Sequence, residues 1–436
     1  LFNSKGAICV TPKKTQLTPR ILKHLLRCND SLKDETGKTI KLVTLISRLI
    51  NNTGFSSYTT SHKVHWVANV CTFCFLVSCV LQVIALFMAK DDPERLFECF
   101  SVLSFCGMGV FKLISLRKSY KSWRFLLTQI STLENEQLNE RSISYVEYQS
   151  DNEECDNFSD YINNYTNKFQ NTSKILTRMY SFTAIIFIFS PFVEHFLCRL
   201  RGMDCLGYPH ILPGWTPLDH LSIFGYIVTV SCEFMAAVYC VCVHVAFDLT
   251  AVGVMIFVCG QYSLLRDYSS RVGGKGKRCN ISKRRDDRAR FRIKQCHRIN
   301  ILLINSITEL DKLLKNIIGV YFFVATLTLC SVAVRLKLED RSIMQLVSLI
   351  QYMCATLTQL FLFCRYGDAV LNESSVGMGQ GPFAAASWCI SPRVRRDLVI
   401  LSIGMMRPRH LRAGPFNYLD LPSFIQVSFC KQSLFQ

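Results

Sequence analysis

The chain has 436 residues, of which 50% are hydrophobic, and its formal net charge is +18 at pH 7. The hydrophobic residues gather in long blocks, which excludes a soluble multi-domain protein with alternating apolar and polar faces. The positive charge lies between these blocks, where it indicates cytoplasmic orientation and argues against a compact nucleic-acid-binding domain.

The first predicted element is an amphipathic stretch. Apolar residues repeat there at helical spacing beside Lys41 and Arg48, at Ile40, Val43, Ile46, Leu49 and Ile50. This pattern predicts a helix that lies either in the membrane interface or against the rest of the bundle.

Two membrane spans are predicted next. Residues 64–89 contain no Asp, Glu, Lys or Arg, and a helix of about 20 apolar residues crosses the hydrocarbon core of a bilayer. A short acidic turn follows, and a second span is predicted at 97–116. The long connection at 117–175 is expected to mix helical extensions of the neighbouring spans with a tip between them.

The middle of the chain predicts two further spans. The third is expected at 180–200, with Pro191 inside it. Cys198 and Cys205 lie at the next predicted outer loop, where an oxidising environment allows them to pair. No proline interrupts 221–265, which as one helix is roughly 68 Å long. A helix of that length projects well beyond a bilayer core of about 30 Å; a re-entrant segment is the alternative.

The C-terminal third begins with a basic linker. Residues 266–298 hold 13 Lys or Arg against three Asp, which predicts a cytoplasmic loop. A fifth span is predicted at 317–334, a sixth at 343–364 and a weaker apolar segment at 415–430. An apolar stripe runs into the fifth span at helical spacing, at Leu303, Ile307, Leu310, Leu314 and Ile317.

Together these elements predict an all-α membrane protein with seven transmembrane helices and long helices that project into the cytoplasm. The predicted outer turns carry seven basic and seven acidic residues, so the positive excess falls on the other side. The N-terminus is therefore expected in the cytoplasm and the C-terminus outside. No His, Cys, Asp or Glu group has catalytic or metal-ligand spacing, so the sequence predicts neither an enzyme nor a cofactor.

Three stretches carry a family resemblance by their order and spacing. The first is the loop LPGWTPLD at 212–219, and the second is Cys296-His297-Arg298 with Cys330 further along the chain. The third is a series of blocks that includes FCRYG at 363–367, RRDL at 395–398, MRPR at 406–409, AGPF at 413–416 and LPSF at 421–424. In these stretches the chain resembles the insect odorant receptor family.

The resemblance implies a subunit of an odorant-gated, non-selective cation channel. In that family an odorant-tuned subunit joins a common co-receptor in a tetramer, in the plasma membrane of the sensory neuron dendrite. The implied domains are a cytoplasmic N-terminal region at 1–63, six helices with their loops at 64–364, and a cytoplasmic anchor with the last pore helix at 365–436. A gustatory-type receptor and a transporter are the alternatives, although no paired interrupted spans indicate a transporter.

Candidate site residues follow from this resemblance and from side-chain chemistry. Small apolar odorants favour aromatic and sulfur-containing residues in the outer halves of the spans, namely Phe100, Phe189, Phe192, Tyr226, Met344 and Tyr352; ordinary helix packing is the alternative for each. The pore helix is expected to include Leu421, Phe424 and Val427. The anchor is expected to include Trp388, Arg395, Arg396 and Arg407, although solvated arginines and an interfacial tryptophan explain these equally well.

Ionisable residues inside spans are costly and often functional. They occur at Glu98, Glu194, His195 and Glu233. We expect Glu233 to face the ligand pocket or to pair with His244.

The chain departs from the family pattern after Val427. The family's last helix continues apolar for about a dozen residues, whereas this chain has Lys431 and ends at Gln436. A lysine is unfavourable in a cation pore because its charge repels cations. Together with Leu1 at the start, this suggests an incomplete or differently spliced version.

Overall fold

The structure is a computed structural model that describes ten stretches of the chain. They are residues 41–52, 62–147, 158–202, 208–216, 222–274, 281–337, 343–375, 378–385, 387–415 and 417–426.

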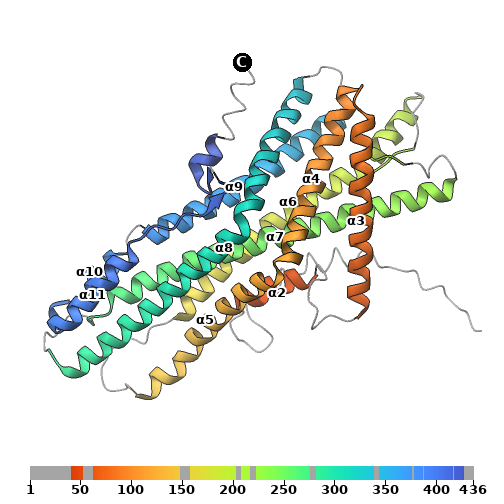
Figure 1. Ribbon diagram of the computed structural model, residues 1–436. Helices are drawn as coiled ribbons and strands as arrows, with labels where there is room; N and C mark the ends of the chain where they lie inside the picture. The colour runs from red at the N-terminus through yellow and green to blue at the C-terminus, as the bar shows by residue number, and fades with distance from the viewer. Residues whose placement is uncertain are drawn as a thin grey trace, which may run out of the picture.

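Long helices dominate the described residues (Figure 1). In chain order the α-helices are α2 (Leu42–Asn52), α3 (His62–Met88), α4 (Pro93–Lys118), α5 (Tyr120–Glu147), α6 (Phe158–Leu200), α7 (Ile223–Ser270), α8 (Lys283–Lys337), α9 (Ile343–Ser375), α10 (Gln380–Ala384) and α11 (Pro392–Met405). A 3-10 turn, η2 (Ser387–Cys389), precedes α11, and two short strands, β1 (Arg412–Ala413) and β2 (Asn417–Tyr418), pair antiparallel.

Six of these helices are long and apolar enough to cross a membrane: α3, α4, α6, α7, α8 and α9. They coincide with the six spans predicted between residues 64 and 364. The all-helical membrane fold expected from the sequence is therefore confirmed. The side of the membrane on which each terminus lies stays a prediction.

Helix α7 is the central element of the bundle. Its 48 residues form one helix of about 72 Å, so the re-entrant alternative is wrong. The side chain of Ser222 caps its first turn by accepting hydrogen bonds from the amides of Phe224 and Gly225. From Val243 to Val258 it is buried on every side, as expected for a helix that is apolar all round. It contacts α2, α3, α4, α6, α8 and α9.

Helix α8 confirms the predicted stripe. It runs without interruption for 55 residues, and Leu303, Ile307, Leu310 and Leu314 are all buried. The preceding helix α6 is also longer than the predicted span, because its first half, from Phe158, packs against α7 and α9.

The N-terminal amphipathic stretch forms α2, and its apolar face packs against the bundle. Leu42 and Ile46 are fully buried in the main hydrophobic core, and Ile46 lies close to Gly253 of α7. Of the two predicted placements, the structure therefore shows packing on the bundle.

The last apolar segment begins later than predicted. Asn417 and Tyr418 form strand β2 rather than the start of a helix, because Gly414 has φ +78° and lies in the turn that brings β2 back against β1. Gly414 also approaches the backbone of Gly319 on α8 and donates its amide to Lys315 O at 2.8 Å. Helix begins at Leu421 and continues to Gln426, and Val427 lies outside the described residues.

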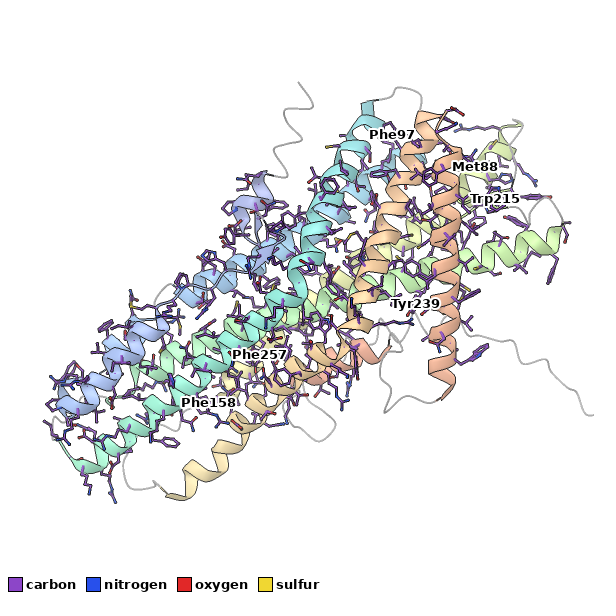
Figure 2. All side chains as sticks on the ribbon, viewed as in Figure 1. Met88, Phe97, Phe158, Trp215, Tyr239 and Phe257 are labelled. Atoms are coloured by element: carbon purple, nitrogen blue, oxygen red, sulfur yellow. The ribbon has the colours of Figure 1, made fainter. Side chains whose placement is uncertain are left out.

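The bundle has two distinct ends (Figure 1). We call one the extended half; it holds α2, α5, α10 and α11 together with the parts of α6–α9 that pack on them. The other, the cavity half, holds α3, most of α4 and the loop at 208–216. Figure 2 shows Met88 and Trp215 in the cavity half and Phe158 in the extended half.

Candidate ligand cavity

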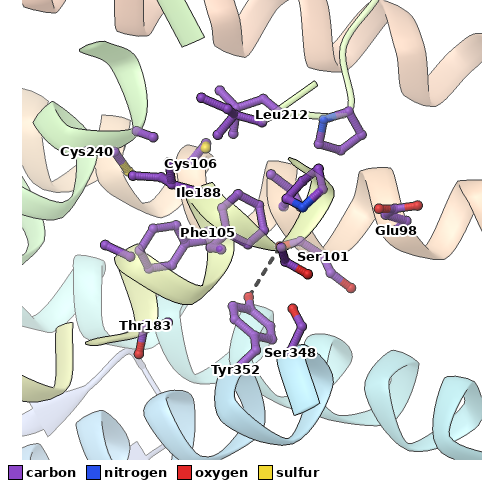
Figure 3. Close-up of a pocket in the computed structure, with 18 of the residues that line it drawn as sticks. Glu98, Ser101, Phe105, Cys106, Thr183, Ile188, Leu212, Cys240, Ser348 and Tyr352 are labelled. Atoms are coloured by element: carbon purple, nitrogen blue, oxygen red, sulfur yellow. Dashed lines mark hydrogen bonds between the residues drawn. The ribbon is translucent and has the colours of Figure 1, made fainter. Parts of the chain in front are cut away.

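The cavity half contains a partly open cavity of about 280 Å³. Its walls come from α4, α6, α7 and α9, and residues 210–213 of the loop before α7 cover one side. These helices diverge in the cavity half, and the space between them is not filled by side chains. Figure 3 shows the cavity with Phe105, Ile188 and Cys240 among its lining residues.

The lining combines apolar and polar groups. Rings and aliphatic chains of Phe105, Phe187, Ile188 and Leu349 form the apolar part, and hydroxyls and carboxylates supply the polar part. The polar groups come from Glu98, Ser101, Tyr180, Thr183, Ser190, Glu194, Ser348 and Tyr352. A mostly apolar cavity with a few polar groups is typical of small-molecule sites.

Hydrogen bonds fix two of the polar groups. The hydroxyl of Tyr352 donates to the carbonyl of Ser101 at 3.2 Å, as Figure 3 shows. The amide of Gln351 donates to Thr183 Oγ1 at 3.0 Å. These bonds tie α9 to α4 and α6, so the cavity walls are connected by side chains as well as by packing.

Glu233 holds the loop that covers the cavity. Its buried carboxylate accepts the backbone amides of Ile211 at 2.9 Å and Leu212 at 3.4 Å, and it lies 3.3 Å from His210 Nδ1. The hydroxyl of Tyr226 donates to the carbonyl of Pro209 at 2.9 Å. Both side chains belong to α7, so this helix positions the loop over the cavity.

A cluster of polar side chains, which we call the Asp248 cluster, adjoins the cavity. It consists of Lys112, Tyr180, His244, Asp248 and Gln359. Lys112 and Asp248 are 0% and 1% exposed and lie 2.6 Å apart. Such a pair is tolerated inside an apolar bundle only when each charge is matched. The ammonium group also lies 5.6 Å from the ring centroids of both Phe247 and Tyr321.

The predicted pocket residues are only partly brought together. Tyr352 lines the cavity, but Phe100, Phe189, Phe192 and Tyr226 do not. Phe189 is 58% exposed and faces away from the bundle, because every third or fourth residue of a helix shares a face and its neighbour Ile188 takes the inward position. Phe192 packs against the hydrophobic cluster that includes the cavity-lining residues Ile188 and Cys240, but it does not itself line the cavity. The side chain of Met344 lies outside the described residues.

The predicted ionisable residues have separate roles. Glu98 and Glu194 line the cavity, and His195 does not. Glu233 holds the loop, so the expected pair with His244 is wrong: 11 residues separate them along α7, and His244 instead lies 3.0 Å from Lys112 Nζ. Sequence reasoning missed Lys112 and Asp248 as a pair, although a lysine in one apolar span and an aspartate in another were the available signal.

The predicted anchor residues lie on the surface of the extended half. Trp388 is 58% exposed, and Arg395, Arg396 and Arg407 are exposed as well, so their role in assembly stays a prediction. In the segment 421–426, the Phe424 ring lies 5.5 Å from that of Phe361 on α9. Leu421 is half-buried.

The predicted disulfide falls partly outside the described residues. Cys198 is disulfide-bonded, whereas Cys205 is not described. The identity of the cysteine that bonds to Cys198 therefore stays a prediction.

Solved structures of other proteins share the fold of this chain. A solved structure, the insect olfactory receptor OR5 from Machilis hrabei in complex with eugenol, superposes with a TM-score of 0.69 over 90% of this chain and 96% of that one, at 12% identity. A second solved structure of the same receptor gives the same TM-score and coverage. At this identity the likeness shows the shared seven-helix fold.

Sequence comparison identifies relatives directly. "Putative odorant receptor 85e" of Drosophila melanogaster is 26% identical over 145 residues, which are 33% of this chain and 31% of that protein. The match therefore spans less than a third of the relative's length. The family model described as 7tm odorant receptor matches residues 92–429, which is most of the chain. The chain belongs to the insect odorant receptor family.

Proposed function

We propose that this chain is the odorant-tuned subunit of an odorant-gated, non-selective cation channel that assembles with a co-receptor in the plasma membrane of olfactory neurons. The observation that carries the proposal is the mostly apolar cavity between α4, α6, α7 and α9 in a chain of the odorant receptor family.

The size of the cavity supports a small volatile ligand. Its volume of about 280 Å³ is nearly twice that of an engineered apolar cavity of about 150 Å³ that binds benzene. Burial of apolar surface contributes about 25 cal/mol per Å² to affinity. The Ser348 hydroxyl lines the cavity and can orient a polar group on the ligand, whereas the Ser101 hydroxyl already donates to Phe97 O at 2.8 Å. The related receptor from Machilis hrabei was solved with eugenol.

Exposed apolar residues in the extended half support assembly with further subunits. They lie on η2, α10 and α11 and the turns beside them, at Phe383, Trp388, Val399, Ile400, Ile403 and Met406. Contiguous exposed apolar residues commonly mark protein–protein interfaces. This surface is our candidate for contact with the co-receptor and with other copies of the chain.

Odorant-evoked current tests the proposal. Cells that express the chain with a co-receptor are exposed to a panel of volatile phenols, alcohols, esters and terpenes that includes eugenol. Ala184→Trp, which fills the cavity, should abolish the response. Its matched control is Ile185→Trp, because Ile185 is the next residue of α6 and is exposed on the outside of the bundle. Equal responses from both variants would place ligand binding elsewhere.

A further inference from the structure

The Asp248 cluster joins four helices at a single carboxylate. Asp248 Oδ1 of α7 faces Lys112 Nζ of α4 at 2.6 Å. Its Oδ2 accepts from the Tyr180 hydroxyl of α6 at 2.5 Å and from the Gln359 amide of α9 at 2.8 Å. The buried ion pair is costly to separate, whereas the two neutral donors share one acceptor and can shift relative to it at lower cost.

Two aromatic rings connect this cluster to the cavity. Tyr180 itself lines the cavity, and so does Phe105. The Phe105 ring stacks on His244, with centroids 4.3 Å apart and planes 9° apart, and His244 Nδ1 lies 3.0 Å from Lys112 Nζ. A ligand that displaces the Tyr180 ring therefore moves a hydrogen-bond donor of Asp248 directly, and one that displaces the Phe105 ring acts on His244 beside Lys112.

On its other side the cluster leads along α9 to the last helical segment. Ser348 and Tyr352 of α9 line the cavity, and Gln359 lies two turns further along the same helix. Two residues beyond it, the Phe361 ring lies 5.5 Å from the Phe424 ring. One helix thus carries cavity residues, the neutral donor of the cluster and the contact with segment 421–426.

We infer that Gln359 is a positioning residue for gating, whose hydrogen bond to Asp248 conveys the presence of a ligand in the cavity to α9 and to segment 421–426. The inference rests on the proposed function. Lys112 and Asp248 form the fixed point of the cluster. A ligand that displaces the Tyr180 ring changes the hydrogen bond from the Tyr180 hydroxyl to Asp248 Oδ2. The Gln359 amide, which donates to the same oxygen, then shifts its position, and α9 moves with it.

The test separates ligand binding from current. Gln359→Leu removes the hydrogen bond at similar size. Thr358→Val is the matched control, because Thr358 is the neighbouring residue of α9, is half-buried, and has a hydroxyl that bonds within its own helix, to Cys354 O. Eugenol is the first probe, followed by the other volatiles of the panel. Binding is measured as the thermal shift of the tagged chain in membranes, and gating as current in the same cells.

For Gln359→Leu we expect the probe concentration for half-maximal thermal shift to stay within about twofold of wild type. The concentration for half-maximal current should rise, or the maximal current should fall, by about tenfold, which is typical of allosteric coupling. Thr358→Val should match wild type in both measurements. Surface labelling establishes that each variant reaches the membrane, and Gln359→Met replaces Gln359→Leu if that variant does not.

A second variant tests the shared acceptor. Tyr180→Phe keeps the ring in the cavity wall and removes only the hydroxyl. The effects of substitutions at independent sites add in a double-mutant cycle. The effects of removing two donors that both act through Asp248 should not add. The combination with Gln359→Leu should therefore reduce current no further than the stronger single variant.

Three outcomes overturn the inference. Gln359→Leu could match Thr358→Val in current, it could shift binding and current equally, or its effect could add to that of Tyr180→Phe. A wild-type chain that binds a probe but gives no current with the co-receptor overturns the proposed channel function, and with it this inference. The wild-type chain is measured first, so failure of the proposed channel function is recognised before any variant is compared.

Discussion

The two halves of the bundle use the same long helices in different ways. In the extended half α6 buries Ile162, Tyr165 and Phe169 against its neighbours. In the cavity half it exposes Phe182, Ile185, Phe189 and Phe196, which suits contact with lipid. One continuous helix therefore passes from a packed core to an apolar surface. In the cavity half, part of the space between the helices is left open for a ligand. In the extended half, close packing holds the helices together.

Helical glycines differ in the space beside them. In the extended half a Cβ added to Gly260 of α7 would lie 2.6 Å from Tyr165 of α6. In the cavity half no atom lies within 4 Å of a Cβ added to Gly107 of α4. Ion pairs differ in burial as well: in the extended half an exposed Arg412 pairs with the buried Asp311, whereas between the halves Lys112 and Asp248 are both buried.

The largest expected effect comes from breaking the buried pair that lies between the halves. Lys112→Met leaves the carboxylate of Asp248 buried without its counter-charge, which should destabilise the fold by about 3–5 kcal/mol. Thermal unfolding of the detergent-solubilised chain measures this. Adding Asp248→Asn removes the remaining charge and should restore much of the stability; a double variant less stable than Lys112→Met alone contradicts this account.

The extended half contains a second buried ionisable group, whose effect depends on pH. Glu134 of α5 is fully buried and accepts a hydrogen bond from the Tyr165 hydroxyl at 2.8 Å. Burial raises the pKa of its carboxyl to about 7, although Tyr165, the amides of Val43 and Leu42, and Lys41 lower it. Since α5 is not among the six candidate spans, this group is expected to lie outside the membrane.

The raised pKa of Glu134 determines the direction in which stability changes with pH. The folded state holds the proton more tightly than the unfolded state, so this contribution to stability is complete below about pH 4. It should be lost as pH rises towards 7, by roughly 3 kcal/mol at 1.4 kcal/mol per pKa unit. Thermal unfolding of wild type and Glu134→Gln across this range isolates the effect, because other groups cancel in the difference. Parallel pH profiles would contradict it.

A smaller effect is expected when the same methyl group is added at two helical glycines, one in each half. Gly260→Ala forces its Cβ against Tyr165, and overpacking of a filled core typically costs about 1–3 kcal/mol. Gly107→Ala is the matched control, because it adds the same methyl group to a helix where space is open. We expect unfolding temperature to fall for the first and to stay level or rise slightly for the second. Equal shifts in unfolding temperature would show that the two glycine sites leave the same space for a methyl group.

The last expected effect is on ligand exit rather than on stability, and it concerns the loop that covers the cavity. Glu233→Leu removes the acceptor for two backbone amides, and a hydrogen bond to a charged group contributes about 1.5–3 kcal/mol. We expect faster decay of odorant-evoked current after washout, by about tenfold, with little change in surface expression. Glu233→Gln keeps one acceptor oxygen and should show a smaller change. An unchanged decay in both variants would mean that the loop does not limit ligand exit.

Several elements of this protein follow from local sequence. Uninterrupted apolar blocks predicted all six candidate spans, and the absence of proline from 221–265 predicted one continuous α7. The stripe from Leu303 to Leu314 predicted the buried face of α8. These features depend on hydropathy and on helix geometry, which neighbouring residues determine. The start of the last segment was misplaced, because the turn at Gly414 depends on its approach to Gly319 on another helix.

The sequence by itself determined the class of the protein, its helices and the chemistry that could occur inside spans. Only the tertiary structure decided which of those side chains meet. Hydropathy does not reveal the rotation of a helix within a bundle that is apolar on all sides, so Ile188 and Phe189 could not be told apart as cavity-facing and outward-facing. Likewise Lys112 and Asp248 are separated by 136 residues. Their pairing arises only when α4 and α7 pack together, because neither charge is stable in the core alone.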